Sequence, residues 1–208
     1  DIQYNELIRG RIIEQGTERP YELTFDVSYA LKLSEKFGMS VAGRYIRSDL
    51  KTRNEGDSNA ASSLGIDISG FYRSDPFDWG SQSMLFRSGF NISNIGPRLS
   101  YDVGGDKSFI PTNLKLGFGV DFLFEDYNTF GIYTEFNKLL VPSPIPSYDE
   151  SGYYLGYRQP DIDFLNGIIT SFNDAQGGIT EELQEITYAI GFEYRLESVF
   201  ALRTGYFH

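Results

Sequence analysis

The chain has 208 residues, of which 40% are hydrophobic and 16% aromatic, and its mean hydropathy is −0.31. Its 29 acidic residues outnumber its 18 basic ones, giving a formal net charge of −11, which argues against nucleic acid as a partner because phosphate binding needs a basic surface. The chain has no cysteine, which excludes disulfides and thiolate metal sites, and no run of about 18 apolar residues that would form a transmembrane helix.

Eight segments alternate large apolar residues with polar or small ones. A period of two is typical of β-strands with two unlike faces. In chain order the predicted strands are 21–31, 39–47, 63–72, 84–92, 113–124, 130–137, 185–196 and 199–207. Several have about 9–12 residues, which suits a tilted membrane-spanning strand better than the shorter strands of globular proteins.

The connections between these strands alternate in length. The tight ones are 34–38, 125–129 and 197–198, the linker 74–83 is intermediate, and the long ones are 48–60, 96–112 and 138–180. In an up-and-down meander, successive connections lie at opposite ends of the sheet. Tight turns at one end and long loops at the other are typical of outer-membrane β-barrels, whereas a Greek-key sandwich has no reason to follow this pattern.

The two faces of the predicted sheet differ in a way that favours a barrel. The polar face combines glycines with charges of both signs, which can pair across strands on the inner side of a curved sheet. We therefore expect the apolar face, including Leu116, Phe118 and Phe122, to point outward to lipid, with Lys115 and Asp121 inside. The alternative is a soluble sandwich, in which the apolar face is buried in a core.

The longest connection, 138–180, contains a segment with helical periodicity. We expect a helix over 161–173, beginning after Pro160 and ended by Gly177–Gly178. Its apolar stripe has spacings of three and four residues and consists of Ile162, Leu165, Ile169 and Phe172. The stripe either packs over the mouth of the barrel or docks a partner or ligand, and we prefer packing because most apolar stripes are buried.

Catalysis, cofactors and metals find little support in the sequence. The single histidine, His208, is the last residue given, so a Ser–His–Asp arrangement is not expected. The Asp/Gly turns at 102–108 and 173–178 do not have the spacing of a calcium loop. We predict no enzyme, no cofactor and no metal site.

Four stretches resemble the PorV family of outer-membrane proteins of the type IX secretion system. They are NISNIGPRLSY (91–101), DKSFIPTNLKLGFG (106–119), NKLLVPSPIP (137–146) and SFNDAQGGITEELQEITYAIGFEY (171–194). They occur in the family's order and with family-like spacing. The sequence departs from the family at Gln176, where a proline is expected before Gly177–Gly178.

The resemblance implies a fold and a role. The family is similar to the fatty-acid-transporter class of barrels, with about fourteen strands, so the chain is expected to be all-β and to supply about eight strands of such a transmembrane barrel. On this view residues 1–208 form one outer-membrane domain, a fragment lacking strands at both ends, with one short helix in a long extracellular loop.

The implied role is that of a non-enzymatic shuttle in the outer membrane. It would bind the C-terminal domains of secreted cargo at the translocon and pass the cargo to a surface attachment complex. Its expected partners are the translocon, the cargo and outer-membrane lipid, and the stripe of Ile162, Leu165, Ile169 and Phe172 is the candidate contact. The alternatives are a transporter of hydrophobic small molecules and a soluble β-sandwich binding module.

Overall fold

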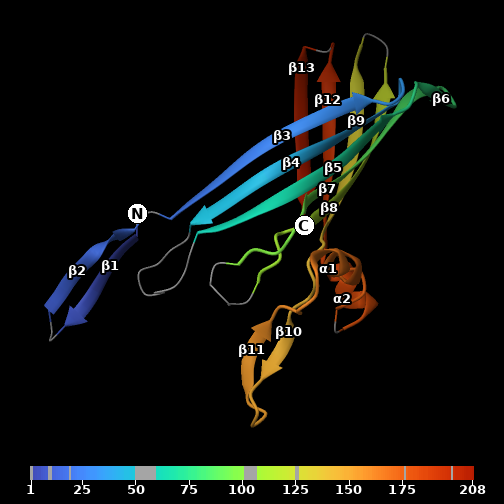
Figure 1. Ribbon diagram of the computed structural model, residues 1–208. Coiled ribbons are helices and arrows are strands. Elements are labelled where there is room, and N and C mark those ends of the chain that lie inside the picture. The colour runs from blue at the N-terminus through green and yellow to red at the C-terminus, as the bar shows by residue number, and fades with distance from the viewer. Residues whose placement is uncertain are drawn as a thin grey trace.

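Most of the chain folds into one large antiparallel sheet, accompanied by two short helices and two separate hairpins (Figure 1). The computed structural model describes residues 2–8, 11–18, 20–49, 60–100, 107–124, 127–175, 177–197 and 199–208. None of the helices in these ranges is long and apolar enough to cross a membrane.

Eight long strands of the described chain follow one another across the large sheet, each antiparallel to the next. Their bounds are β3 Tyr21–Lys32, β4 Phe37–Asp49, β5 Ala61–Arg73, β7 Gln82–Ile95, β8 Asn113–Leu123, β9 Thr129–Leu139, β12 Ile186–Leu196 and β13 Phe200–Phe207. A short ninth strand, β6 Phe77–Trp79, pairs with the start of β7. All eight predicted strands are confirmed within a few residues, because each carries the alternation that a two-faced sheet requires.

The predicted alternation of connections is also confirmed. The strand ends joined by tight connections and the β6–β7 hairpin lie at one end of the sheet. The strand ends joined by long connections lie at the other end, together with both helices (Figure 1). The large sheet is open, with β3 at one edge and β13 at the other, and no ladder joins these two strands in the described residues. No closed barrel is therefore seen in the described residues, which differs from the predicted barrel fold.

Two hairpins stand apart from the large sheet and were not predicted. β1 Ile2–Ile8 pairs with β2 Arg11–Glu18, and β10 Ile145–Tyr148 pairs with β11 Tyr154–Arg158 inside the longest connection. Their short strands lack the clear alternation of the eight long ones. The β10–β11 hairpin projects away from the sheet at the long-loop end (Figure 1).

The longest connection holds two helices where one was predicted. α1 spans Phe164–Thr170, shorter than the predicted 161–173, because Asp163 caps its N-terminus and accepts hydrogen bonds from the backbone N–H groups of Leu165 and Asn166, both at 3.0 Å. These hydrogen bonds lower the pKa of the Asp163 carboxyl, and the one from the Asn166 N–H has the largest effect. α2, Ile179–Gln184, occupies residues just before β12 for which no helix was predicted.

The orientation of the sheet agrees with the predicted outward apolar face. Leu116 and Phe118 are exposed, Phe118 by 42%, and Phe122 is half-buried, while Asp121 on the opposite face is only 1% exposed. The apolar residues of β3 are exposed in the same way: Tyr21, Leu23, Phe25, Val27, Tyr29 and Leu31. A sandwich core would enclose these side chains, so the sandwich interpretation is not supported. Lys115 lies on the same face as Asp121, as predicted, and is exposed because the open sheet leaves this face uncovered.

Candidate functional site

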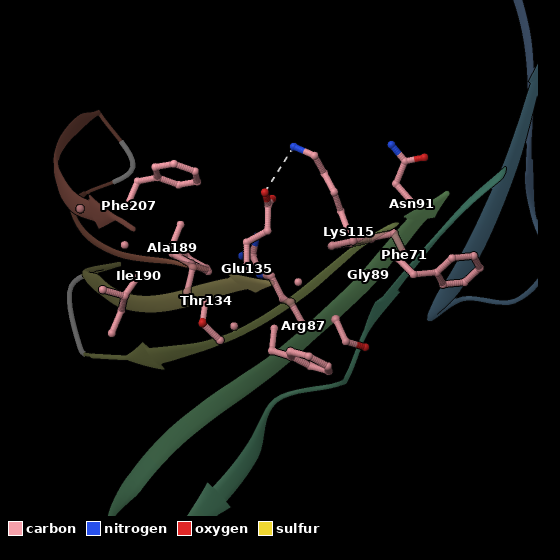
Figure 2. Close-up of a pocket in the computed structure, with 18 of the residues that line it drawn as sticks. Phe71, Arg87, Gly89, Asn91, Lys115, Thr134, Glu135, Ala189, Ile190 and Phe207 are labelled. Atoms are coloured by element: carbon pink, nitrogen blue, oxygen red, sulfur yellow. Dashed lines mark hydrogen bonds and ion pairs between the residues drawn. The ribbon is translucent and has the colours of Figure 1, made fainter. Parts of the chain in front are cut away.

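Two adjoining rows of residues cross the polar face of the sheet and floor a hollow of about 860 Å³ (Figure 2). In register across six strands, the first row is Phe71, Gly89, Gly117, Glu135, Ala189 and Phe207. The second row runs from Arg87 through Gly119, Tyr133 and Gly191 to Gly205. Glycine and alanine keep the floor low, and the hollow lies between the aromatic side chains of Phe71 and Phe207 (Figure 2).

Charged side chains on this face pair across strands, as the sequence predicted. Arg87 forms an ion pair with the buried Asp121, which also accepts a hydrogen bond of 2.6 Å from the Tyr133 hydroxyl. The Tyr133 ring lies flat over Gly119, where an added Cβ would come within 2.5 Å of the ring. Lys115 and Glu135 pair at 3.3 Å beside the hollow (Figure 2).

A second cluster of contacts, at the end of β7, joins two of the four motifs that resemble the PorV family. Asn94 adopts a positive φ of 59° at a β-bulge between β5 and β7. Its side-chain oxygen accepts a 2.5 Å hydrogen bond from Arg44, and its backbone carbonyl accepts one of 2.7 Å from the Thr112 hydroxyl. Gly96 lies directly against the backbone of Leu64. The ISNIGP and FIPTN segments therefore meet in space, which their separation in the sequence did not reveal.

Described residues of the two longest connections pack together at the long-loop end of the sheet. We call residues 96–100, 107–112, 140–144, 160–175 and 177–185 the loop assembly. Its small core contains the buried side chains of Ile110 and Leu140. Gly167 of α1 packs against Phe109 and Pro142, with room only for a glycine. Both helices are thus attached to the long-loop end of the sheet.

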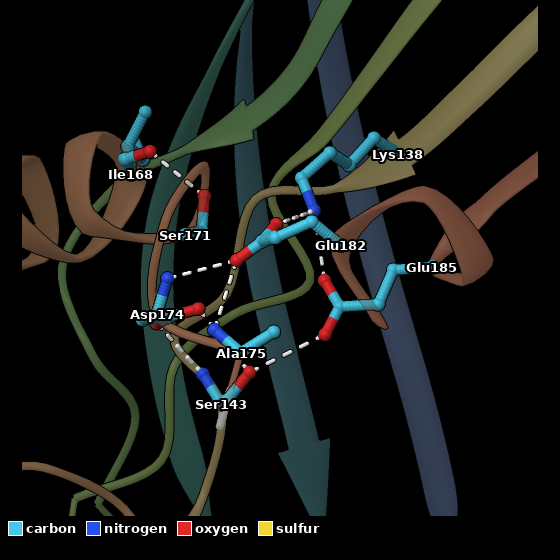
Figure 3. Close-up of polar contacts among 8 residues, drawn as sticks. All are labelled: Lys138, Ser143, Ile168, Ser171, Asp174, Ala175, Glu182 and Glu185. Atoms are coloured by element: carbon cyan, nitrogen blue, oxygen red, sulfur yellow. Dashed lines mark hydrogen bonds and ion pairs between the residues drawn. The ribbon is translucent and has the colours of Figure 1, made fainter. Parts of the chain in front are cut away.

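A buried ion cluster joins α2 to the end of β9 (Figure 3). The Lys138 ammonium lies 3.0 Å from a Glu182 carboxylate oxygen and 2.7 Å from one of Glu185. Glu182 also accepts hydrogen bonds of 2.8 Å from the backbone N–H groups of Asp174 and Ala175. The hydrogen bond from the Ala175 N–H has the largest effect and lowers the pKa of the Glu182 carboxyl, and the hydrogen bond from Lys138 lowers it further. This carboxyl is therefore ionised at neutral pH.

The predicted stripe in this connection is mostly uncovered. Leu165 is 55% exposed, Ile169 70% and Phe172 51%, whereas Ile162 is half-buried. The helix instead turns Gly167 towards the loop assembly. The described chain therefore does not cover Leu165, Ile169 and Phe172, and the preferred interpretation, packing over the mouth of the barrel, stays a prediction for these three residues. Ile179 and Leu183 of α2 are exposed as well and extend the set of uncovered apolar residues. The sequence analysis did not identify these two residues because it did not predict α2.

Metal binding finds no support in the described part of the chain. No group of three or more His, Cys, Asp or Glu residues there could hold a metal ion. Residues 102–106 of the first Asp/Gly turn, and Gln176 of the second, lie outside the described residues.

Comparison with known families decides the identity of the chain. A family model described as "Type IX secretion system protein PorV" matches residues 2–146, more than two thirds of the chain. The chain belongs to the PorV family. This confirms the resemblance inferred from the sequence motifs. The PorV family is a component of a secretion system with no known catalytic role.

The PorV match includes some of the candidate sites and leaves others out. It covers β3 to β9, the Asn94 bulge and Lys138, but it ends before α1 and α2. The stripe of Ile162, Leu165, Ile169 and Phe172 lies beyond it. A search of curated proteins finds no match.

Proposed function

We propose that this PorV family chain is part of an outer-membrane β-barrel that carries secreted proteins from the translocon to the cell surface. Residues 1–208 then form a single domain, a fragment of a barrel of about fourteen strands, whose remaining strands pair with the edges of β3 and β13. The observation that carries the proposal is the exposed apolar face of the sheet, opposite a face of paired charges. Strands of this kind put their apolar side chains in lipid and their polar ones in the lumen.

Two phenylalanines on opposite faces test this orientation. Phe118 on the apolar face is 42% exposed and Phe71 on the polar face 52%, so both are similarly uncovered by protein. Phe118→Arg should lower the free energy of unfolding in lipid vesicles by about 2–4 kcal/mol, because arginine is costly at the bilayer midplane. Phe71→Arg, on the luminal side, should have a much smaller effect. Urea titration of both variants measures this, and equal losses would contradict the proposed orientation.

The long-loop end is the proposed cargo contact, since it presents Leu165, Ile169 and Phe172 to the outside on a folded support. Its function is tested by the double variant Leu165→Asp and Phe172→Asp. Neither residue lies in the sheet, so we expect assembly in the membrane to be unchanged, while recovery of secreted proteins with the affinity-tagged protein falls by about tenfold.

A matched control comes from the tight-turn end of the sheet. Tyr127 and Val199 are 85% and 90% exposed, and changing both to Asp should leave recovery of secreted proteins unchanged. If the double variant of Leu165 and Phe172 fails to assemble while recovery per folded molecule stays constant, the stripe contributes only to packing.

A second candidate function is transport of hydrophobic small molecules, favoured by the hollow on the polar face. The rings of Phe71 and Phe207 and several glycines line this hollow, so a molecule in it would contact mostly carbon atoms. Mass spectrometry of the purified protein separates the two functions, because a transporter retains a small molecule and a shuttle retains secreted protein.

A further inference from the structure

The β10–β11 hairpin carries three tyrosine rings, of which the middle one contacts both others, and the rest of the described chain does not cover them. The ring centroids of Tyr148 and Tyr154 are 5.8 Å apart, and those of Tyr154 and Tyr157 5.7 Å, both edge-to-face. The three residues are 59%, 54% and 70% exposed. Tyrosine supplies rigid contact area with a polar tip and is enriched in protein interfaces. We call these three residues the tyrosine cluster.

The hairpin also has an open edge. β10 and β11 pair with each other and with no other strand in the described residues. A two-stranded hairpin is only marginally stable in water, and a third strand stabilises it. Pro146 removes a backbone donor from β10, whereas β11, Tyr154–Arg158, contains no proline. The edge of β11 is therefore the better one for pairing with an extended chain.

A bulge in β11 shapes the face beside this edge. The register shifts between Ser147 and Tyr148, with Leu155 as the extra residue of β11. The extra residue lets Tyr154 and Tyr157, three apart in sequence, share the face on which Tyr148 lies, as their ring contacts require. The tyrosine cluster and the edge of β11 thus belong to one continuous surface.

The connection that carries the hairpin has a net negative charge. Residues 138–185 contain eight carboxylates and two basic side chains, Lys138 and Arg158. Glu182 and Glu185 pair with Lys138, and Asp161 pairs with Arg98, which leaves five carboxylates against Arg158. Opposite charge steers association and discriminates between partners. An occupant of this surface is expected to be basic.

We propose that the β10–β11 hairpin docks an extended, basic segment of polypeptide, which pairs with the edge of β11 and packs its side chains on the tyrosine cluster. This proposal deepens the proposed function. It rests on that function in one respect, namely that the docked segment belongs to a secreted protein. Backbone pairing would supply sequence-tolerant affinity, as a carrier of many different proteins requires.

Direct binding to the complete protein in nonionic detergent tests the proposal. The probe is a fluorescein-labelled dodecapeptide of alternating lysine and valine, followed by fluorescence anisotropy. The double variant Tyr154→Ala and Tyr157→Ala should bind it at least about tenfold more weakly, and the exposed Tyr127→Ala at the opposite end should bind it as the unchanged protein does. Replacing the lysines of the peptide by glutamate, or N-methylating alternate residues, should also weaken binding about tenfold.

Several results would overturn the proposal. Equal binding by the tyrosine double variant would exclude the tyrosine cluster as the docking surface, and equal binding of the N-methylated peptide would exclude strand pairing. Tyrosine-dependent binding to anionic lipid vesicles in place of the peptide would make the hairpin a membrane contact. In cells, unchanged recovery of secreted proteins with the tyrosine double variant would contradict the role of the hairpin but not the shuttle function. No recovery of secreted proteins even with the unchanged protein would contradict the shuttle function. In that case the peptide-binding result alone decides whether the hairpin docks an extended segment.

Discussion

Replacing Lys138 by alanine should lower the free energy of unfolding of the loop assembly by about 3–5 kcal/mol, because it removes the cation from a buried ion cluster. The Lys138 side chain is 8% exposed and Glu182 11%. In the described residues these two glutamates, Glu182 and Glu185, form ion pairs with Lys138 alone. Without it, two neighbouring carboxylates repel each other in a poorly solvated place, and α2 should detach from the end of β9.

The absence of cysteine gives a clean measurement of this effect. A single Thr180→Cys substitution on exposed α2 carries an environment-sensitive dye, and its signal is followed during urea titration. The control is Lys115→Ala, which breaks a Lys–Glu pair whose partners are 46% and 47% exposed, and should cost less than about 1 kcal/mol. If Lys138→Ala costs no more than this control, the ion cluster does not stabilise the loop assembly.

Gly96→Ala should destabilise the protein by about 3 kcal/mol, although it adds only one methyl group. That methyl carbon would lie 2.0 Å from the backbone oxygen of Leu64 and 3.0 Å from Ile110. A backbone oxygen in a strand cannot move without disturbing the pairing of β5, so the bulge at Asn94 and the core residue Ile110 would both shift.

The matched control is Gly43→Ala in β4, where nothing lies within 4 Å of the added carbon. It should be neutral or slightly stabilising, because alanine loses less backbone freedom on folding than glycine does. Urea midpoints of the two variants give the comparison. Similar midpoints would mean that the chain around Gly96 yields easily and that Gly96 is not held by Leu64.

The strands of the sheet could be predicted because each carries its own signal. In β8, the alternation from Leu114 to Phe122 indicates for every residue the face of the sheet on which its side chain lies, and no distant contact is needed to interpret it. The same alternation does not indicate whether a face contacts lipid, water or a protein core. Only the three-dimensional arrangement places Phe118 outside and Asp121 against Arg87 and Tyr133.

The candidate contact surfaces were harder to predict because distant residues determine them. The stripe from Leu165 to Phe172 was found by its spacing, but its exposure depends on Gly167 packing against Phe109 and Pro142. The tyrosine cluster gave no periodic signal, since a bulge at Leu155 breaks the alternation. α2 was missed because Gly177–Gly178 indicates the end of one helix as readily as the beginning of another; Gly178 is in fact its N-cap.

The two rows that floor the hollow on the polar face also bear on what a molecule in the hollow would contact. Tyr133 lies over Gly119 and Gly131, whereas Gly117 and Gly191 have only a backbone oxygen 3.9 Å away. At these two positions the inner side of the sheet carries no side chain. A molecule in the hollow would therefore meet the bare backbone of β8 and β12, so its fit there would depend on main-chain geometry and not on the chemistry of a side chain.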